Sequence, residues 1–176
     1  QQVSSAASDV YKRQIYMLTL DYNITDKKEN VGKTYQQEIN WIVSNKRRNN
    51  FIRNLSIDMK GNTLVLFQFV DKHGKVLYDL ITNKADDSRK IFYVSGQTDA
   101  TDRETIRKIV ETQKDAIIVA SLGTFSTGIN IKNLHNIVFA SPSKSQIRVL
   151  QSIGRSLRKS DDCLLYTSDA ADDTCC

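Results

Sequence analysis

Four short apolar runs, separated by longer polar segments, limit the folds open to this chain more than any other feature. The runs are residues 63–69 (TLVLFQF), 90–94 (KIFYV), 116–120 (AIIVA) and 136–140 (NIVFA). Such short apolar runs are typical of strands buried on both faces of a parallel sheet. Helical segments are expected between them, over 72–82 and from Thr98 or Asp99 to about residue 112. This alternation predicts a three-layer α/β domain with a mostly parallel sheet.

Three further elements are expected outside these runs. Residues 15–22 are β-prone and predict a strand, and a last helix is expected from Ser143 or Ser145 through Arg158. Residues 34–57 predict one helix, whose apolar face carries Ile39, Ile42, Val43, Phe51 and Leu55. Ligands of parallel sheets bind outside the carboxyl ends of the strands. We therefore look for function in the segments that follow Phe69, Val94, Ala120 and Ala140.

The two ends of the chain differ in composition from the rest. Residues 1–14 are polar without a clear period, and residues 163–176 switch to small and acidic side chains. Both resemble translated sequencing adapter, and the alternative is a pair of natural disordered tails. We therefore expect residues 15–162 to form the domain, as a fragment of a longer protein.

Composition excludes several classes of protein. The three cysteines all lie in residues 163–176, which argues against a disulfide framework or a thiolate metal site and for a reducing, cytoplasmic setting. His73 and His135 lack the spacing of metal ligands and are expected at the surface or in loops. No apolar run approaches the ~20 residues of a membrane span, so no membrane partner is expected. The net charge of +5 favours a polyanionic partner only weakly.

One apparent nucleotide motif fails. Gly32-Lys33-Thr34 imitates the end of a phosphate-binding P-loop, but Lys27 stands where the first glycine is needed. No acidic cluster for magnesium is present either, so the chain is expected to be unable to hydrolyse ATP alone. The segment is interpreted as the entry to a helix.

The strongest local signal is QSIGRSLR at residues 151–158. Arg155 and Arg158 are three positions apart, so on a helix they share a face and reach the same ligand. Guanidinium groups suit phosphate because they are planar, permanently charged and bidentate. The alternative is a solvated basic helix end.

Four segments in order resemble the motifs of superfamily 2 helicases. TLVLFQF resembles motif IV, VSGQTD with Arg103 resembles motif IVa, ASLGTFSTGINI resembles motif V, and QSIGRSLR resembles motif VI. The likeness covers roughly residues 15–160 and extends to a bacteriophage type of DNA helicase that acts in recombination and fork repair. It implies the C-terminal RecA-like domain of such a helicase, a fold of the P-loop NTPase type.

The resemblance also implies roles for individual residues. ATP with Mg²⁺ would be held mainly by an N-terminal RecA-like domain of the same polypeptide, absent from this chain. Arg155 and Arg158 would reach its γ-phosphate as arginine fingers. Gln151 would help place their helix, and Gly154 would permit close approach of the nucleotide or a backbone. Gly128 and Asn130 would lie near the ribose, but many family members have Asp at the position of Asn130, which puts an ionic role there in doubt.

DNA is the expected partner, contacted mainly through its phosphate backbone. The candidate residues are Ser95, Gly96 and Arg103 in one segment and Ser121, Thr124, Ser126 and Thr127 in the next. The hydroxyls have turn capping as their alternative, and Arg103 has pairing with Glu104 or Asp99. Phe69 is expected in the core rather than stacked on adenine, and Trp41 is expected to be a packing residue.

Three other functions remain open. A double-strand DNA translocase of the same superfamily shares these motifs, and an RNA helicase does too, because phosphate contacts discriminate sugars poorly. The third is of another class, an isolated non-catalytic nucleic-acid-binding module.

Overall fold

A computed structural model describes residues 16–21, 34–128 and 131–142 of the 176-residue chain. Its strands are β1 (Thr63–Phe67), β2 (Ile91–Val94), β3 (Ile117–Ser121) and β4 (Asn136–Phe139). They form one sheet in the order β2-β3-β1-β4, and all three neighbouring pairs are parallel. The predicted parallel sheet is confirmed. β1, β2 and β4 lie within the apolar runs that predicted them, and β3 extends one residue beyond its run, to Ser121.

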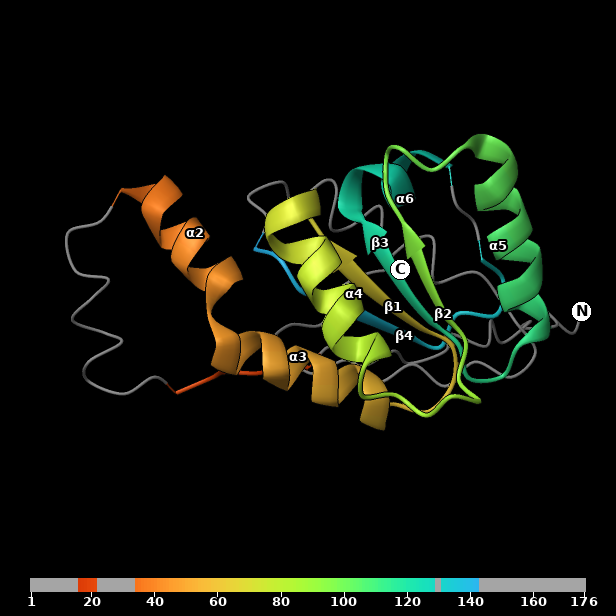
Figure 1. The fold of residues 1–176 in the computed structure, drawn as a ribbon, viewed down its shortest axis with the longest axis horizontal. Helices are drawn as coiled ribbons and strands as arrows, with labels where there is room; N and C mark the ends of the chain where they lie inside the picture. The colour runs from red at the N-terminus through yellow and green to blue at the C-terminus, as the bar shows by residue number, and fades with distance from the viewer. Residues whose placement is uncertain (1–15, 22–33, 129–130, 143–176) are drawn as a thin grey trace, which may run out of the picture.

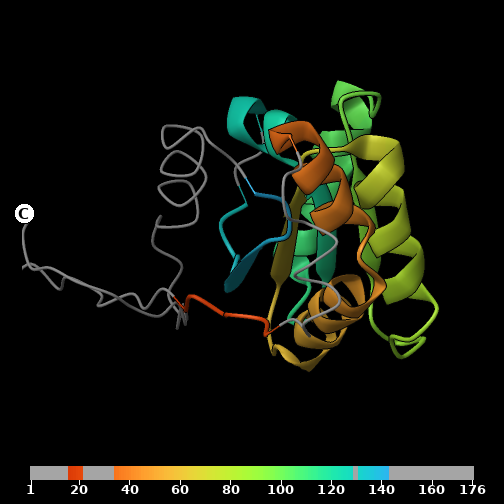
Figure 2. The ribbon, with the colours of Figure 1, turned by 90° about the vertical axis from the view of Figure 1, so that its left-hand side faces the viewer.

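Helices cover both faces of the sheet (Figures 1 and 2). They are α2 (Tyr35–Ser44), α3 (Lys46–Asp58), the single π-helical turn η1 (Val70–Gly74), α4 (Lys75–Thr82), α5 (Ala100–Thr112) and α6 (Leu122–Gly128). Helices α3 and α4 pack on one face, and α5 and α6 pack on the other. The result is the three-layer α/β domain that the sequence predicts. No helix of the described residues is both long and apolar enough to cross a membrane.

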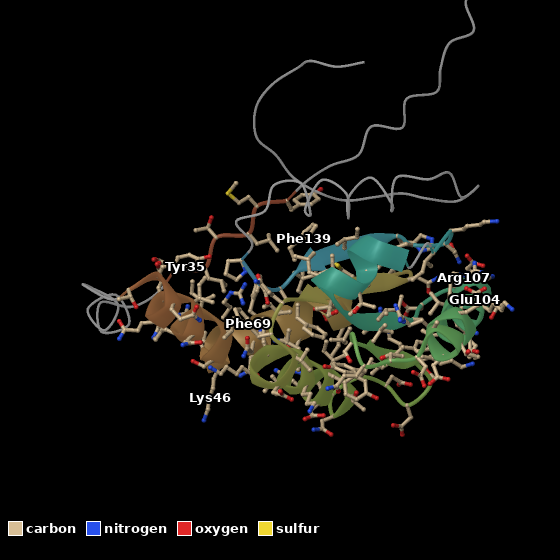
Figure 3. All side chains as sticks on the ribbon, turned by 90° about the horizontal axis from the view of Figure 1, so that it is seen from above. Tyr35, Lys46, Phe69, Glu104, Arg107 and Phe139 are labelled. Carbon is tan, nitrogen blue, oxygen red and sulfur yellow. The ribbon has the colours of Figure 1, made fainter. Side chains whose placement is uncertain are left out.

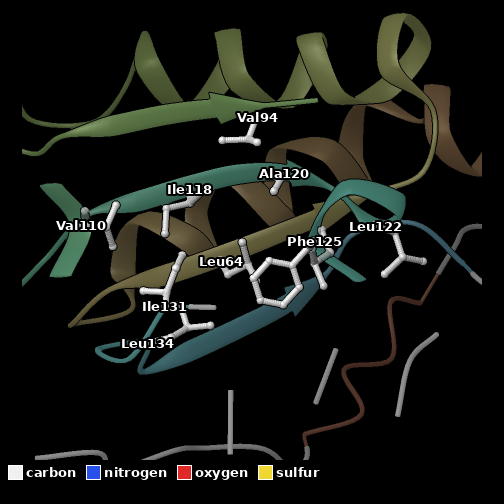
Figure 4. Packing of buried hydrophobic residues seen from close by; sticks show 11 residues of the cluster. Leu64, Val94, Val110, Ile118, Ala120, Leu122, Phe125, Ile131 and Leu134 are labelled. Atoms are coloured by element: carbon white, nitrogen blue, oxygen red, sulfur yellow. The ribbon is translucent and has the colours of Figure 1, made fainter. Parts of the chain in front are cut away.

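The alternation of side chains along each strand builds two cores. Leu64 of β1 and Ile118 of β3 point toward α5 and α6, where Phe125 lies against them (Figure 4). Val65 and Phe67 point toward α3 and α4. All five residues of β1 are buried, as are all five of β3, which explains why these runs are continuously apolar instead of alternating.

The helix predicted over residues 34–57 is two helices. Asn45 adopts an extended conformation that ends α2, and its side chain accepts a hydrogen bond from the Arg48 amide at 2.9 Å to cap α3. Thr34 begins α2 with a reciprocal capping box to Gln37, which confirms the interpretation of that segment as a helix entry. Of the predicted apolar face, Ile39 and Val43 are buried, whereas Ile42, Phe51 and Leu55 are only half-buried; Ile52 is the apolar residue that α3 buries.

The strand predicted over residues 15–22 is wrong for its described part. Residues 16–21 have no regular secondary structure, and Tyr16, Met17 and Leu18 are exposed. The local preference for extended backbone is not sufficient without a neighbouring strand to accept its hydrogen bonds. The helix predicted from residue 143 to Arg158 lies outside the described residues.

Two buried polar side chains hold the amino-terminal edge of the sheet. The amide of Asn62 donates to three carbonyl oxygens, and its own oxygen accepts from the Ala116 amide at 2.8 Å. The guanidinium of Arg89 donates to the carbonyl oxygens of Ile57 and Met59 and pairs with Asp115 at 2.7 Å. These contacts fix the end of α3 and the start of β3 relative to each other.

Candidate nucleotide and nucleic-acid interface

The carboxyl ends of the described strands meet at one edge of the sheet, as parallel pairing requires. The turn 95–98 follows β2, helix α6 follows β3, η1 follows β1, and Ser141 lies just after β4. Figure 3 shows the domain from above and labels Phe69, which follows β1, and Phe139, the last residue of β4. The edge therefore gathers the segments that the sequence marked as candidates for function.

The turn after β2 is held by its own polar groups. Ser95 is buried, its amide donates to the Thr98 hydroxyl at 3.0 Å, and its carbonyl accepts from the Thr98 amide at 3.1 Å. The Ser95 hydroxyl accepts from the Gln97 amide at 3.3 Å. Gly96, at the tip, is exposed. Helix α5 begins after Asp99, as predicted, although the Asp99 side chain forms no capping hydrogen bond.

The segment after β3 is a helix and not the expected loop. Ser121 and Thr124 are buried, and their hydroxyl oxygens are 2.6 Å apart. The Thr124 amide also donates to the Ser121 hydroxyl at 3.2 Å. Both hydroxyls thus serve the capping role that was their alternative, because they close the first turn of α6. Ser126, Thr127 and Gly128 continue the backbone of α6.

The two segments that resemble motifs IVa and V lie next to each other. A Cβ atom built on Gly96 would be 3.9 Å from the Thr124 hydroxyl oxygen. The turn after β2 therefore lies beside the first turn of α6.

Arg103 is oriented by the turn that precedes its helix. Its Nε donates to the Thr98 carbonyl oxygen at 3.0 Å. Glu104, one of its two expected partners, instead pairs with Arg107 at 2.6 Å, and Arg107 also pairs with Glu111 at 2.7 Å (Figure 3). The hydrogen bond from Arg107 holds the pKa of Glu104 below its usual value. Arg103 therefore remains associated with the turn at the strand ends.

His73 was expected at the surface and is instead fully buried. Its Nδ1 lies 2.8 Å from the Ser141 hydroxyl, and its Nε2 lies 3.2 Å from the side-chain oxygen of Asn49. Burial, reinforced by the positive charge of Arg48, lowers the pKa of His73 to about 4, so the ring is neutral at physiological pH. Sequence reasoning missed this group because its members lie on three separate elements.

His135 lies in the loop before β4, as expected. It is half-buried, and its Nδ1 accepts a hydrogen bond from the Asn62 backbone amide at 3.1 Å. Phe69 is half-buried and belongs to neither hydrophobic cluster, which corrects the expectation of a core residue. Trp41 is half-buried on α2. Within the described part of the chain, no three acidic, histidine or cysteine side chains gather closely enough to hold a metal ion.

The remaining predicted residues lie outside the described part of the chain. They are Asn130, Gln151, Gly154, Arg155 and Arg158. Their roles stay predictions. So do the phosphate contacts proposed for Ser95, Gly96, Arg103, Ser121, Thr124, Ser126 and Thr127, whose positions at the sheet edge are consistent with such contacts.

Comparison with known proteins decides the family. Residues 46–160 match the helicase conserved C-terminal domain. The chain belongs to this family. The ATP-dependent DNA helicase uvsW of Enterobacteria phage T4 is 48% identical over 131 residues, which cover 73% of this chain and 25% of that protein. The match confirms the resemblance to a bacteriophage DNA helicase.

The solved structures agree with the sequence match. The crystal structure of T4 UvsW aligns with a TM-score of 0.65 and 45% sequence identity, over 76% of this chain and 27% of that one. The helicase C-terminal domain described here thus spans about a quarter of the length of the UvsW relative. Its four-stranded parallel sheet is the sheet of a helicase C-terminal RecA-like domain.

Proposed function

We propose that this domain is the second motor domain of an ATP-dependent DNA helicase that acts in recombination, repair or fork remodelling. In this proposal, ATP with Mg²⁺ is bound mainly by a preceding RecA-like domain of the same polypeptide. Arg155 and Arg158 reach the γ-phosphate across the cleft and stabilise the charge of the transition state. Gln151 helps place that helix, Gly154 permits close approach of the nucleotide, and Gly128 and Asn130 lie near the ribose.

The observation that carries the proposal is that the turn at Gly96 lies beside the first turn of α6 at the strand ends. A Cβ atom built on Gly96 would lie 3.9 Å from the Thr124 hydroxyl oxygen, so the segments that resemble motifs IVa and V adjoin each other, in a chain 48% identical over 131 residues to an ATP-dependent DNA helicase. Exposed Gly96 permits close approach of a phosphate chain, and Arg103 stands beside the same turn. Such contacts grip the backbone without reading sequence, as a motor that steps along DNA requires.

The mechanism needs two domains because the nucleotide site lies between them. Closing of the cleft between the two domains brings Arg155 and Arg158 to the γ-phosphate, and ATP hydrolysis allows the cleft to open again. Each domain holds the same DNA strand, so alternate closing and opening moves the protein along that strand. This domain contributes the two arginines and one of the two DNA-binding surfaces.

The test is Arg158→Ala in the complete helicase. We expect DNA-stimulated ATP hydrolysis to fall by a factor of about 10³ or more, which is the contribution of arginine fingers in other motors. Arg107→Ala is the matched control, because it removes a guanidinium that only pairs with two carboxylates of its own helix. Hydrolysis within tenfold of wild type in the folded Arg158→Ala protein would exclude the proposed role.

Three further measurements separate the alternatives. Strand displacement by the complete protein distinguishes a helicase from a double-strand translocase. The comparison of DNA with RNA as activator of ATP hydrolysis distinguishes a DNA motor from an RNA motor. ATP hydrolysis by the 176-residue chain alone would contradict the requirement for a preceding domain, and an inactive complete protein that still binds DNA would favour a non-catalytic binding module.

A further inference from the structure

A buried polar network lies at the carboxyl ends of β1 and β4. It consists of Asn49, His73 and Ser141, and we call it the His73 network. The three side chains are between 0 and 7% exposed, and they come from α3, η1 and the segment after β4. None of the motif-like segments that the sequence singled out contains any of the three.

The backbone groups at the two ends of the network determine which atom donates and which accepts in each hydrogen bond. The Asn49 amide nitrogen donates to the Val43 carbonyl at 2.9 Å, so the Asn49 oxygen faces His73 and accepts from Nε2. The Nδ1 atom of His73 then has a lone pair and accepts from the Ser141 hydroxyl. The Ser141 oxygen accepts in turn from the Gln68 amide at 3.0 Å. Each of these polar atoms is satisfied, and the arrangement requires a neutral histidine.

The chemistry of the site keeps that histidine neutral. Burial lowers the pKa of His73 to about 4, and the positive charge of Arg48 acts in the same direction. The network therefore keeps one pattern of donors and acceptors throughout the physiological pH range. A fully satisfied buried network of this kind fixes the relative positions of the elements that it joins.

The His73 network joins the segment after β4, which leads toward the two arginines, to helices α2 and α3. Ser141 follows β4, next to Ala140, whose amide donates to the Leu66 carbonyl of β1 at 2.9 Å. The sequence that continues from Ser141 carries Arg155 and Arg158. On the other side, Asn49 ties the network to α3 and, through Val43, to α2. The first residues that lead toward the arginines are thus fastened to the end of β1 and to two helices.

We propose that His73 is a positioning residue for ATP hydrolysis, which acts through Ser141 to fix the start of the segment that carries Arg155 and Arg158. The inference rests on the proposed function, because it concerns the placement of the two arginines. A misplacement of about 1 Å at a reacting centre lowers a rate by up to ~10²-fold. ATP itself is held mainly by the preceding domain, so the loss is expected in kcat and not in KM.

The primary test compares Ser141→Ala with Ser141→Thr in the complete helicase. Ser141→Ala removes the hydroxyl that His73 accepts from, and we expect kcat of DNA-stimulated ATP hydrolysis to fall about tenfold or more. The KM for ATP and the affinity for DNA should change less than about threefold. Ser141→Thr keeps the hydroxyl and should restore kcat to within about threefold of wild type.

A matched control separates positioning from stability. Ser56→Ala removes another buried hydroxyl, which donates to the Ile52 carbonyl within α3. It should leave kcat unchanged, and the melting temperatures of both variants are measured alongside. Equal loss of kcat in Ser56→Ala and Ser141→Ala would overturn the proposal, and so would wild-type kcat in Ser141→Ala.

The coupling between His73 and Ser141 gives a second, independent readout. His73→Phe keeps an aromatic ring, although a larger one, and removes both hydrogen bonds, so kcat should fall as in Ser141→Ala. Because both changes break one interaction, the double variant should be no slower than the slower single variant. If the two changes lower kcat independently, so that their factors multiply in the double variant, the proposal is overturned. Arg158→Ala, measured in parallel, separates the two claims: if it abolishes hydrolysis while the Ser141 variants remain normal, only the positioning role fails.

Discussion

The imidazole ring of His135 occupies the space into which a side chain on Gly61 would project. A Cβ atom on Gly61 would lie 2.7 Å from Cγ of His135, and Gly61 has a positive φ of 87°. The same ring accepts a hydrogen bond from the backbone amide of Asn62. The turn before β1 therefore requires glycine for two reasons, its backbone conformation and the ring beside it.

Gly61→Ala should accordingly destabilise the domain. The left-handed conformation costs a non-glycine residue about 1–2 kcal/mol, and displacement of the His135 ring adds to that cost. Thermal unfolding followed by circular dichroism measures the change. Gly123→Ala is the control, because a Cβ atom there meets nothing within 4 Å and alanine favours the helix. A Gly61→Ala protein as stable as the Gly123→Ala protein would contradict this prediction.

Arg89 and Asp115 should contribute unequally to stability although they form one ion pair. The Arg89 side chain is 8% exposed and also donates to the carbonyl oxygens of Ile57 and Met59, whereas the Asp115 side chain is 52% exposed. Arg89→Met should lower the free energy of unfolding by about 3 kcal/mol, because it leaves buried carbonyl groups without donors. Asp115→Ala should cost at most about 1 kcal/mol, as exposed ion pairs do. Denaturant unfolding of the two variants gives both values, and equal losses would show that the ion pair dominates.

His73 should make stability depend on pH in the weakly acidic range. Its pKa is about 4 in the folded protein against 6.5 for an unperturbed histidine, so the unfolded chain binds a proton that the folded chain does not. The free energy of unfolding should therefore be highest above pH 6.5 and fall as the pH drops toward 4. Each unit of pKa difference corresponds to about 1.4 kcal/mol, so the loss at pH 5 approaches about 2 kcal/mol.

The measurement is denaturant unfolding between pH 5 and 7, which lies above the range in which the exposed carboxylates Asp86 and Glu104 titrate. Hydrogen bonds to their neighbours lower the pKa of both groups, so their contributions fall away at more acidic pH. His73→Phe removes the titrating group and should give a flatter profile over the same interval. Parallel profiles for the two proteins would show that another group is responsible.

Gly96 should matter for DNA binding but not for folding. A Cβ atom at this position meets only the Thr124 hydroxyl at 3.9 Å, so Gly96→Val places its Cβ atom without a clash. If a phosphate chain passes over the turn, the added methyl groups block it, and the affinity for single-stranded DNA should fall about tenfold. Fluorescence anisotropy at two salt concentrations measures this effect. The control is Asn54→Ala, at an exposed position of α3. Unchanged affinity would place the DNA elsewhere on the domain.

The fold was accessible from the sequence because burial on both faces leaves a local signature. Leu64 and Val65 are adjacent in the chain and belong to opposite cores, so β1 must be apolar at successive positions. The break between α2 and α3 was less visible, because the apolar spacing continues through it. Asn45, a residue that favours helix caps, was the signal that could have located the break.

The hydrogen-bonding pattern of the site was not accessible in the same way. His73 and Ser141 are separated by 68 positions, and Asn62 reaches carbonyl groups up to 71 positions away. Nothing in the local sequence around a buried polar residue names its distant partner. Ser121 and Thr124 were correctly placed after a strand, but their mutual hydrogen bond depends on a helix, α6, that the sequence did not predict.

The π-helical turn η1 determines which side chains of η1 and α4 face the sheet after β1. The Gly74 amide donates to the Phe69 carbonyl five residues earlier, and a side chain on Gly74 would collide with the Phe67 ring at 2.5 Å. Loss of one residue from this turn would rewind it as an ordinary α-helix and rotate the residues before the deletion by about 100° relative to α4. His73 and the apolar stripe of α4 would then no longer face the sheet together. Relatives of this domain that lack the extra residue are therefore expected to lack the buried histidine as well.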